Sequence, residues 1–334
     1  MSLNSPYLRK PTSVTQVMTE VLLALLPGIG VYCWFFGVGL LMQLALATAS
    51  VLLCEAAFLT LRGRPIKPAL ADLSAVVTAW LIALSFPPIG PWWLVVVASA
   101  FAIVIAKHLY GGLGQNPFNP AMVAYAAMII AFPALMSQWP GADQLDARSQ
   151  LDLIFSGPRV LDAITAATPL DAMRTGLRAE GSTVASLLHG PTFGHFAGHG
   201  WEWVSAAFLL GGVYLLVRRI ITWHIPAAFL GTLTLLAALA SMLAPQTFPG
   251  PMFTLFSGAS ILGACFILTD PVSGATTPRG KLIYAAGAAL ITWIIRHFGA
   301  FPDGVAFATL LMNLCVPLID MKTQPPVFGH KTKG

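Results

Sequence analysis

The sequence predicts an all-α, polytopic membrane protein with about ten transmembrane helices. Hydrophobic residues make up 57% of the 334-residue chain, and charged residues make up only 9%. Because roughly a quarter of the residues of an ordinary soluble domain are charged, this chain has too few charges to cover a globule of its length. Its apolar residues are gathered in runs of the length that a membrane-spanning helix needs.

Ten apolar runs follow one another along the chain. Five precede a long polar segment at 138–201 and five follow it, so the predicted organisation is a tail at 1–13, helices in 14–137, the polar segment, helices in 202–320 and a tail at 321–334. The weakest boundary is the one between the first two runs, at Trp34 to Gly37. The runs are 14–34, 36–61, 69–87, 91–109, 121–137, 202–220, 226–244, 250–269, 282–298 and 303–320.

The distribution of Lys and Arg predicts the orientation of the chain. If the N-terminus is inside, thirteen basic residues fall in inside segments and five in outside segments, four of them in the long polar segment. The positive-inside rule then places both termini in the cytoplasm and 138–201 outside. The net charge of +5 comes from short clusters between apolar runs, which indicates topology signals and no nucleic-acid partner.

Two stretches rich in Gly and Pro, 110–120 and 269–280, interrupt the apolar pattern on the predicted cytoplasmic side. Non-helical backbone at membrane depth is tolerated only inside protein or beside a cavity, and such breaks often mark binding sites in transporters. Plain surface turns are the alternative. Similar sequences flank the two breaks, which suggests a faint internal repeat that relates the two halves in parallel.

The polar segment contains a candidate attachment site at Thr168. The sequence Thr168-Pro169-Leu170-Asp171 has a favoured N-cap, Pro at the first helical position and an acid at the third, so it predicts a short helix that ends near Gly176. A phosphate esterified to Thr168 would lie at the N-terminus of this helix, where free N–H groups stabilise an anion. Arg174 or Arg178 could add a cationic contact. Helix capping alone also explains the pattern.

A second stretch has the same skeleton as 162–168. Asp270 to Thr276 contains an acid, two further residues, a hydroxyl residue, a small residue, Ala and Thr, and it has Gly274 where the first stretch has Ala166. The predicted topology separates the two stretches, because Thr276 faces the cytoplasm and Thr168 faces outside.

Other polar residues are weaker candidates. Glu55 and Asp72 lie in or beside apolar runs, where ionisable groups are candidates for an ion path, although simple pairing with Arg62, Arg64 and Lys67 is the alternative. His195 and His199 have a spacing that suits a metal on a helix, but the surrounding glycines indicate a loop, and no metal site is predicted. The four cysteines lie in apolar runs without a CxxC pair, as small buried hydrophobic residues do.

Five motifs make the chain resemble a known family of membrane subunits. That family includes the D subunit of the Rnf ion-translocating oxidoreductase and, more distantly, the B subunit of the sodium-pumping NADH:quinone reductase. The resemblance covers nearly the whole chain, and the first motif is long and specific. The motifs are Lys107–Met122 (KHLYGGLGQNPFNPAM), Ala167–Asp171 (ATPLD), Phe266–Val272 (FILTDPV), Pro302–Phe307 (PDGVAF) and Val316–Asp320 (VPLID).

The resemblance implies an FMN joined through its phosphate to a Thr outside the membrane. Carried onto this sequence, the acceptor is Thr168, and Asp162 and Thr165 belong to the motif that a flavin transferase reads, in which Ala166 replaces the usual Gly. The resemblance also implies two inverted five-helix repeats, in contrast to the parallel repeat suggested by the breaks. A second, non-covalent flavin is left open.

The expected function is therefore that of a multi-pass subunit of the bacterial inner membrane, surrounded by lipid. It would relay electrons between ferredoxin and NADH through FMN, coupled to Na⁺ or H⁺ movement, with the other Rnf subunits supplying the missing substrate sites. Two alternatives remain open. One is a secondary transporter or channel without a redox cofactor, and the other is a structural scaffold in which Thr168 is only a helix cap.

Overall fold

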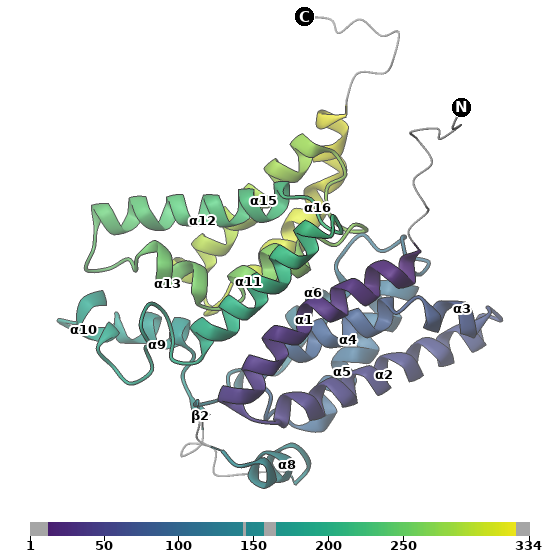
Figure 1. Cartoon of the computed structure of the whole chain (residues 1–334), viewed down its shortest axis with the longest axis horizontal. Helices are drawn as coiled ribbons and strands as arrows, with labels where there is room; N and C mark the ends of the chain where they lie inside the picture. The colour runs from purple at the N-terminus through teal and green to yellow at the C-terminus, as the bar shows by residue number, and fades with distance from the viewer. Residues whose placement is uncertain (1–12, 143–144, 157–164, 325–334) are drawn as a thin grey trace, which may run out of the picture.

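The computed structural model describes residues 13–142, 145–156 and 165–324. The chain is mainly helical, and its helices form two groups, one from each half of the sequence (Figure 1). The connecting segment carries the short helices α8 (Ala147–Phe155), α9 (Pro169–Gly176) and α10 (Val184–Leu188) at one end of the molecule. The start of the first helix and the end of the last described helix lie at the opposite end (Figure 1).

Each predicted apolar run coincides with helical structure. The first half contains α1 (Val14–Phe36), α2 (Gly39–Leu61), α4 (Ser74–Ser85), α5 (Trp92–Ala100) with the π-helix η1 (Phe101–His108), and α6 (Pro120–Ala131). The second half contains α11 (Trp201–Val217), α12 (His224–Leu243), α13 (Pro251–Phe256) with α14 (Ser260–Leu262) and the π-helix η2 (Gly263–Ile267), α15 (Pro278–Phe298) and α16 (Val305–Thr323). Two short helices, α3 (Ile66–Ala71) and α7 (Pro133–Met136), flank the runs of the first half.

The length and composition of these helices are those of a polytopic membrane protein. Within the described residues, four helices are long and apolar enough to cross a membrane, namely α1, α2, α12 and α16. The apolar helices α4, α6 and α11 and the combined α5–η1 helix are shorter. The weak boundary between the first two runs is confirmed, because Gly37, with φ at 84°, ends α1 and α2 begins at Gly39.

Two expectations are corrected. The run at 250–269 is not one helix, because the chain unwinds between Phe256 and Ser260, where Gly258 has φ at 63°. The Arg296 guanidinium stabilises this break by donating to the Thr254 carbonyl (3.0 Å) and the Ser260 hydroxyl (2.9 Å). The cysteines also differ from one another, since Cys265 is buried as predicted and Cys315 is exposed.

Both Gly- and Pro-rich stretches are non-helical breaks, and a π-helix precedes each of them. η1 ends at His108, before a turn in which Gly111 and Gly112 have φ at 123° and 104°. η2 ends at Ile267, before the second break. Asn119 ends the first break by capping α6, because its Oδ1 atom accepts hydrogen bonds from the N–H groups of Ala121 and Met122. Single π-helical turns are frequent at functional sites.

The two breaks meet in a buried polar junction, and its hydrogen bonds link the two halves. The backbone N–H of Asn119 donates to Asn313 Oδ1 (3.2 Å), and its side-chain amide donates to the Ile267 carbonyl (3.4 Å). Asn313 Nδ2 in turn donates to the Ser273 carbonyl (2.9 Å) and to the Tyr284 hydroxyl (3.0 Å). The junction therefore satisfies backbone groups that broken helices leave free in apolar surroundings.

Small residues bring α1 and α11 close together. Gly211 lies directly against the Ala24 carbonyl, and Gly28 lies against the Phe208 ring. Small residues at helix interfaces allow the close backbone approach that holds membrane helices together. Towards the start of α1, buried Glu20 accepts hydrogen bonds from Tyr214 (2.5 Å) and from Arg218.

Gly211→Val is expected to weaken the contact between the two halves. Its new side chain would overlap Ala24, and overpacking of a close contact costs about 1–3 kcal/mol. Thermal unfolding in detergent should therefore show a lower midpoint. Gly231→Val is the matched control, because Gly231 also lies inside a helix and its Cβ position is open. An equal effect of both substitutions would contradict the importance of this contact.

Candidate functional site

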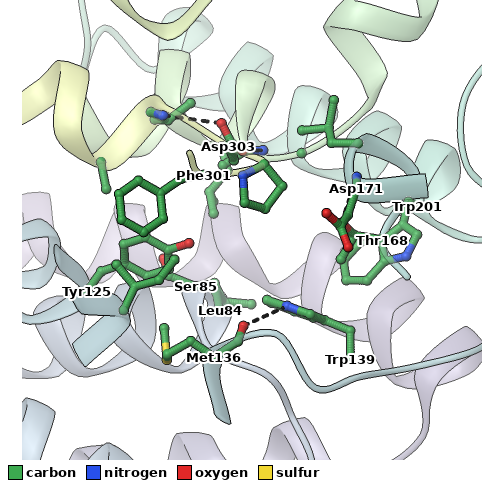
Figure 2. A pocket seen from close by; sticks show the side chains of 18 of the residues that line it. Leu84, Ser85, Tyr125, Met136, Trp139, Thr168, Asp171, Trp201, Phe301 and Asp303 are labelled. Carbon is green, nitrogen blue, oxygen red and sulfur yellow. Dashed lines mark hydrogen bonds between the residues drawn. The ribbon is translucent and has the colours of Figure 1, made fainter. Parts of the chain in front are cut away.

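A cavity of about 320 Å³ lies between the two halves, beside α9. This volume is within the range of about 300–1,000 Å³ that is usual for small-molecule sites. Figure 2 shows Thr168 and Trp201 on one side of it, Tyr125 and Ser85 opposite, and Asp303 with Phe301 along a third side. The aromatic residues that line it are Tyr32, Tyr125, Trp139, Trp201, Phe208 and Phe301.

Thr168 lies at this cavity as the N-cap of α9, which spans the predicted residues. Its Oγ1 atom accepts a hydrogen bond from the Asp171 N–H at 3.4 Å, and Pro169 occupies the first helical position. The half-buried Thr168 side chain is thus a cap and a part of the cavity wall at the same time. The helix prediction is confirmed, and capping does not remove Thr168 from the cavity.

A short β ladder connects the predicted transferase motif to the cavity. Strand β2 (Thr165–Ala166) pairs antiparallel with β1 (Trp139–Pro140), with Trp139 opposite Ala166. Trp139 lines the cavity, and its indole N–H donates to the Met136 carbonyl at 3.1 Å (Figure 2). Asp162, the first residue of the motif, lies outside the described residues.

Aromatic contacts fix the orientation of Trp201. Its ring meets the Tyr32 ring edge-on, with centroids 5.4 Å apart, and the Trp139 ring at 5.5 Å. The Phe36 ring packs against it at 4.3 Å. Because such pairs restrict ring rotation, Trp201 presents a fixed apolar surface close to Thr168.

The charges beside Thr168 have opposing effects on an anion. Asp171 lines the cavity and would repel a phosphate, whereas Arg174, one turn later, also lines it and would attract one. Arg174 Nη1 donates to the Ala300 carbonyl at 2.8 Å, which holds the guanidinium beside the cavity. Arg178 does not line the cavity.

One buried hydroxyl group of the cavity wall is unsatisfied. Tyr32 is 1% exposed, and in the part of the chain that the structure describes its hydroxyl oxygen has no hydrogen-bond partner. Because buried polar groups normally have partners, an unpaired hydroxyl in a cavity wall fits a ligand with polar edges. The aromatic walls fit a planar ring system such as a flavin.

The second threonine candidate lies in a different environment. Thr276 is exposed, and its hydroxyl donates to Asp320 Oδ2 at 2.8 Å near the end of α16. Thr276 does not line the aromatic cavity. The similarity of the two sequence skeletons therefore does not extend to their surroundings.

Glu55 and Asp72 are engaged in contacts that differ from the predicted ones. Glu55 is 1% exposed, and its Oε1 atom accepts a hydrogen bond from Lys107 Nζ (2.7 Å) and contacts His108 Nε2 (3.0 Å), in place of Arg62 or Arg64. Asp72 Oδ1 accepts the N–H of Ser74 (2.7 Å) at the start of α4. Glu55 thereby attaches η1 to α2, and Asp72 binds the first N–H group of α4.

Sequence reasoning missed most of the cavity wall. Tyr32, Trp139 and Trp201 lie at the ends of apolar runs, where aromatic residues are common in membrane proteins, and nothing local in the sequence sets them apart. Asp303 is within a motif that carried the family resemblance, and it accepts a hydrogen bond from the Ala259 N–H (2.7 Å) in the broken helix. The motif Pro302–Phe307 was therefore the one feature of the sequence that could have indicated this side of the cavity.

The fold and site define a polytopic α-helical membrane protein with a ligand-sized aromatic cavity beside the N-cap threonine of α9. Comparison with known proteins specifies the family. The model of the NQR2, RnfD, RnfE family matches residues 1–329, so the chain belongs to this family. The chain is also 51% identical to the D subunit of the ion-translocating oxidoreductase complex of Vibrio cholerae serotype O1 (strain ATCC 39541 / Classical Ogawa 395 / O395). It is 47% identical to the protein of the same name from Escherichia coli O139:H28 (strain E24377A / ETEC), with 98% of each chain covered in both comparisons.

Lys107→Met is expected to destabilise the protein, because it removes the ammonium group that pairs with the buried Glu55 carboxylate and leaves His108 as its remaining basic neighbour. Removing one partner of a buried ion pair costs about 3–5 kcal/mol. The double variant Glu55→Gln/Lys107→Met leaves neither charge buried and should recover most of the loss. Chemical unfolding in detergent would compare the variants, and a double variant no more stable than the single one would contradict this role.

Proposed function

We propose that this chain is the membrane subunit of an ion-translocating electron-transfer complex and carries FMN esterified to Thr168. The observation that carries the proposal is the position of the Thr168 hydroxyl at the aromatic cavity. Full-length similarity to proteins named as the D subunit of an ion-translocating oxidoreductase complex supports it. When bound, the flavin supplies the redox chemistry, and the protein sets its position and surroundings.

The residues around Thr168 support a phosphoester there. An esterified phosphate would lie at the N-terminus of α9, where the free N–H groups and the helix dipole favour an anion. Arg174 would offset the repulsion from Asp171. Trp201 and Trp139 would pack against the ring and exclude water from it. Asp162 and Thr165 would serve the flavin transferase as recognition residues.

The topology proposed for the chain is ten spans, arranged as two inverted five-helix repeats in the bacterial inner membrane. Both termini are cytoplasmic in this proposal, and 138–201 faces the periplasm. The distribution of Lys and Arg supports this orientation. The position of α8, α9 and α10 at the end opposite to the start of α1 agrees with it (Figure 1).

A second, smaller cavity of about 130 Å³ lies between the two helix breaks. Its wall includes Lys107, Asn116, Asn119 and Asp270. A non-covalent flavin is proposed there beside Asn116, and because the volume is below that of a usual ligand site, a neighbouring subunit would complete it. The NADH and ferredoxin sites belong to other subunits of the complex in this proposal.

Coupling to Na⁺ or H⁺ is assigned to the same region. Glu55 Oε2 has no hydrogen-bond partner within the described residues, although it is buried beside Lys107. An unpaired carboxylate oxygen of this kind can accept a cation or a proton. Asp72 is the second residue proposed for the ion path. It accepts a hydrogen bond from the Ser74 N–H, and the Ser74 hydroxyl in turn accepts one from Lys107 at 2.9 Å.

The broken helices also favour a secondary transporter or channel as an alternative function. Non-helical breaks beside cavities are typical of transporter binding sites. This alternative predicts solute flux through the isolated chain in vesicles and no bound chromophore, whereas the electron-transfer proposal predicts a yellow protein.

The attachment site is tested by flavin fluorescence of the denatured band after gel electrophoresis. The full-length chain, produced in a host that contains the flavin transferase, should give a fluorescent band. Thr168→Ala should abolish the fluorescence, because it removes the hydroxyl that carries the phosphate. Thr276→Ala is the matched control and should remain fluorescent. A fluorescent Thr168→Ala band would overturn the assignment, and a dark Thr276→Ala band would overturn the proposed topology as well.

A further inference from the structure

The loop Phe193–Gly200 lies directly against the helix that carries Thr168. Gly198 is packed on the ring of Pro169, the residue that follows Thr168, so closely that a Cβ atom at Gly198 would overlap the ring. Pro169 itself is buried. The position of α9, and therefore of Thr168, depends on where this loop lies.

A buried carboxylate holds the loop in place. Glu202 is 1% exposed, and it accepts hydrogen bonds from three consecutive backbone N–H groups, those of His195 (3.2 Å), Phe196 (3.0 Å) and Ala197 (3.1 Å). These are the residues immediately before Gly198. Glu202 also lies in the first turn of α11, where the helix dipole favours its negative charge. Charge-assisted hydrogen bonds of this kind are stronger than neutral ones.

The same loop connects the attachment helix to the aromatic wall. Backbone hydrogen bonds from Gly194 to the Ala197 carbonyl (2.8 Å) and from His199 to the Thr192 carbonyl (3.0 Å) close it into a compact turn. Gly200, with φ at 78°, ends the loop, and Trp201 follows as the first residue of α11. One element thus touches the residue after Thr168 and leads directly into the tryptophan of the cavity.

We infer that Glu202, acting through Gly198, is a positioning residue that holds a flavin attached at Thr168 against Trp201 inside the cavity. This inference rests on the proposed attachment to Thr168 and adds the residues that place the attached ring. Neither Glu202 nor Gly198 lines the cavity, so their effect on the ring is exerted through Pro169 and Trp201. The loop therefore determines the surroundings of the flavin and not its chemical attachment.

The test is the flavin fluorescence of the purified full-length chain in detergent, divided by that of the same sample after denaturation. Division by the denatured value removes differences in the amount of attached flavin. A tryptophan in contact with the ring quenches its emission, so the wild-type ratio should be low. Gly198→Ala should raise the ratio at least twofold, because the added methyl group displaces Pro169 and α9. Gly250→Ala is the matched control, since its Cβ position is open and its φ is −70°.

Two further variants separate positioning from general loss of structure. Gly198→Ala/Pro169→Ala removes the ring that the new methyl group would meet, so the ratio should return towards the wild-type value. Glu202→Gln has nearly the same shape but no charge, and it should raise the ratio as well, because a neutral amide holds the three N–H groups less strongly. If Gly198→Ala does not yield folded protein, Glu202→Gln decides the question.

The outcomes are distinct. If Gly198→Ala and Glu202→Gln both keep the wild-type fluorescence ratio, the inference is overturned while attachment at Thr168 stands. The inference is also overturned if Gly198→Ala/Pro169→Ala keeps the same raised ratio as Gly198→Ala. A denatured wild-type band without fluorescence would overturn the proposed attachment and this inference with it.

Discussion

The arrangement of this protein depends on the need to satisfy backbone groups that broken helices expose in apolar surroundings. Asn119 and Asn313 meet this need at the centre, where they bind the Ile267 and Ser273 carbonyls. Both amides are buried, so loss of either would leave polar groups without partners. At this junction the two halves are therefore joined by hydrogen bonds that the helix breaks make possible.

The same constraint explains how the aromatic cavity is kept open. Near Gly258 the chain leaves the helical path, and the freed Thr254 and Ser257 carbonyls are bound by Arg296. Asp303 pairs with Arg296 at 3.1 Å, and it also accepts a hydrogen bond from the Ala259 N–H. The buried Arg296 and the partly exposed Asp303 thus hold a non-helical wall in a fixed shape beside Thr168. Gly258 is close enough to Leu170 for this wall to support α9 as well.

Local patterns in the sequence predicted the helices well and the site only in part. The apolar runs and the cap at Thr168 depend on neighbouring residues, so they could be identified without the structure. The break near Gly258 could not, because the Arg296 that stabilises it lies about 40 residues away in the chain. The partner of Glu55 was missed for the same reason, since Lys107 is 52 residues away. The walls of a cavity are assembled from separate helices, and hydropathy carries no information about which helices meet.

The two similar threonine stretches show why the surroundings matter more than the sequence skeleton. Thr276 has the better match to the transferase motif, but its hydroxyl and N–H both bind the Asp320 carboxylate. A phosphate at Thr276 would face that carboxylate and would displace these hydrogen bonds. Within the described residues, the Thr168 hydroxyl accepts a long hydrogen bond from its own helix, Arg174 lies further along that helix, and a cavity of suitable size lies beside it. The electrostatic cost of an anion is therefore lower at Thr168, which is the physical basis for choosing it over its closer sequence match.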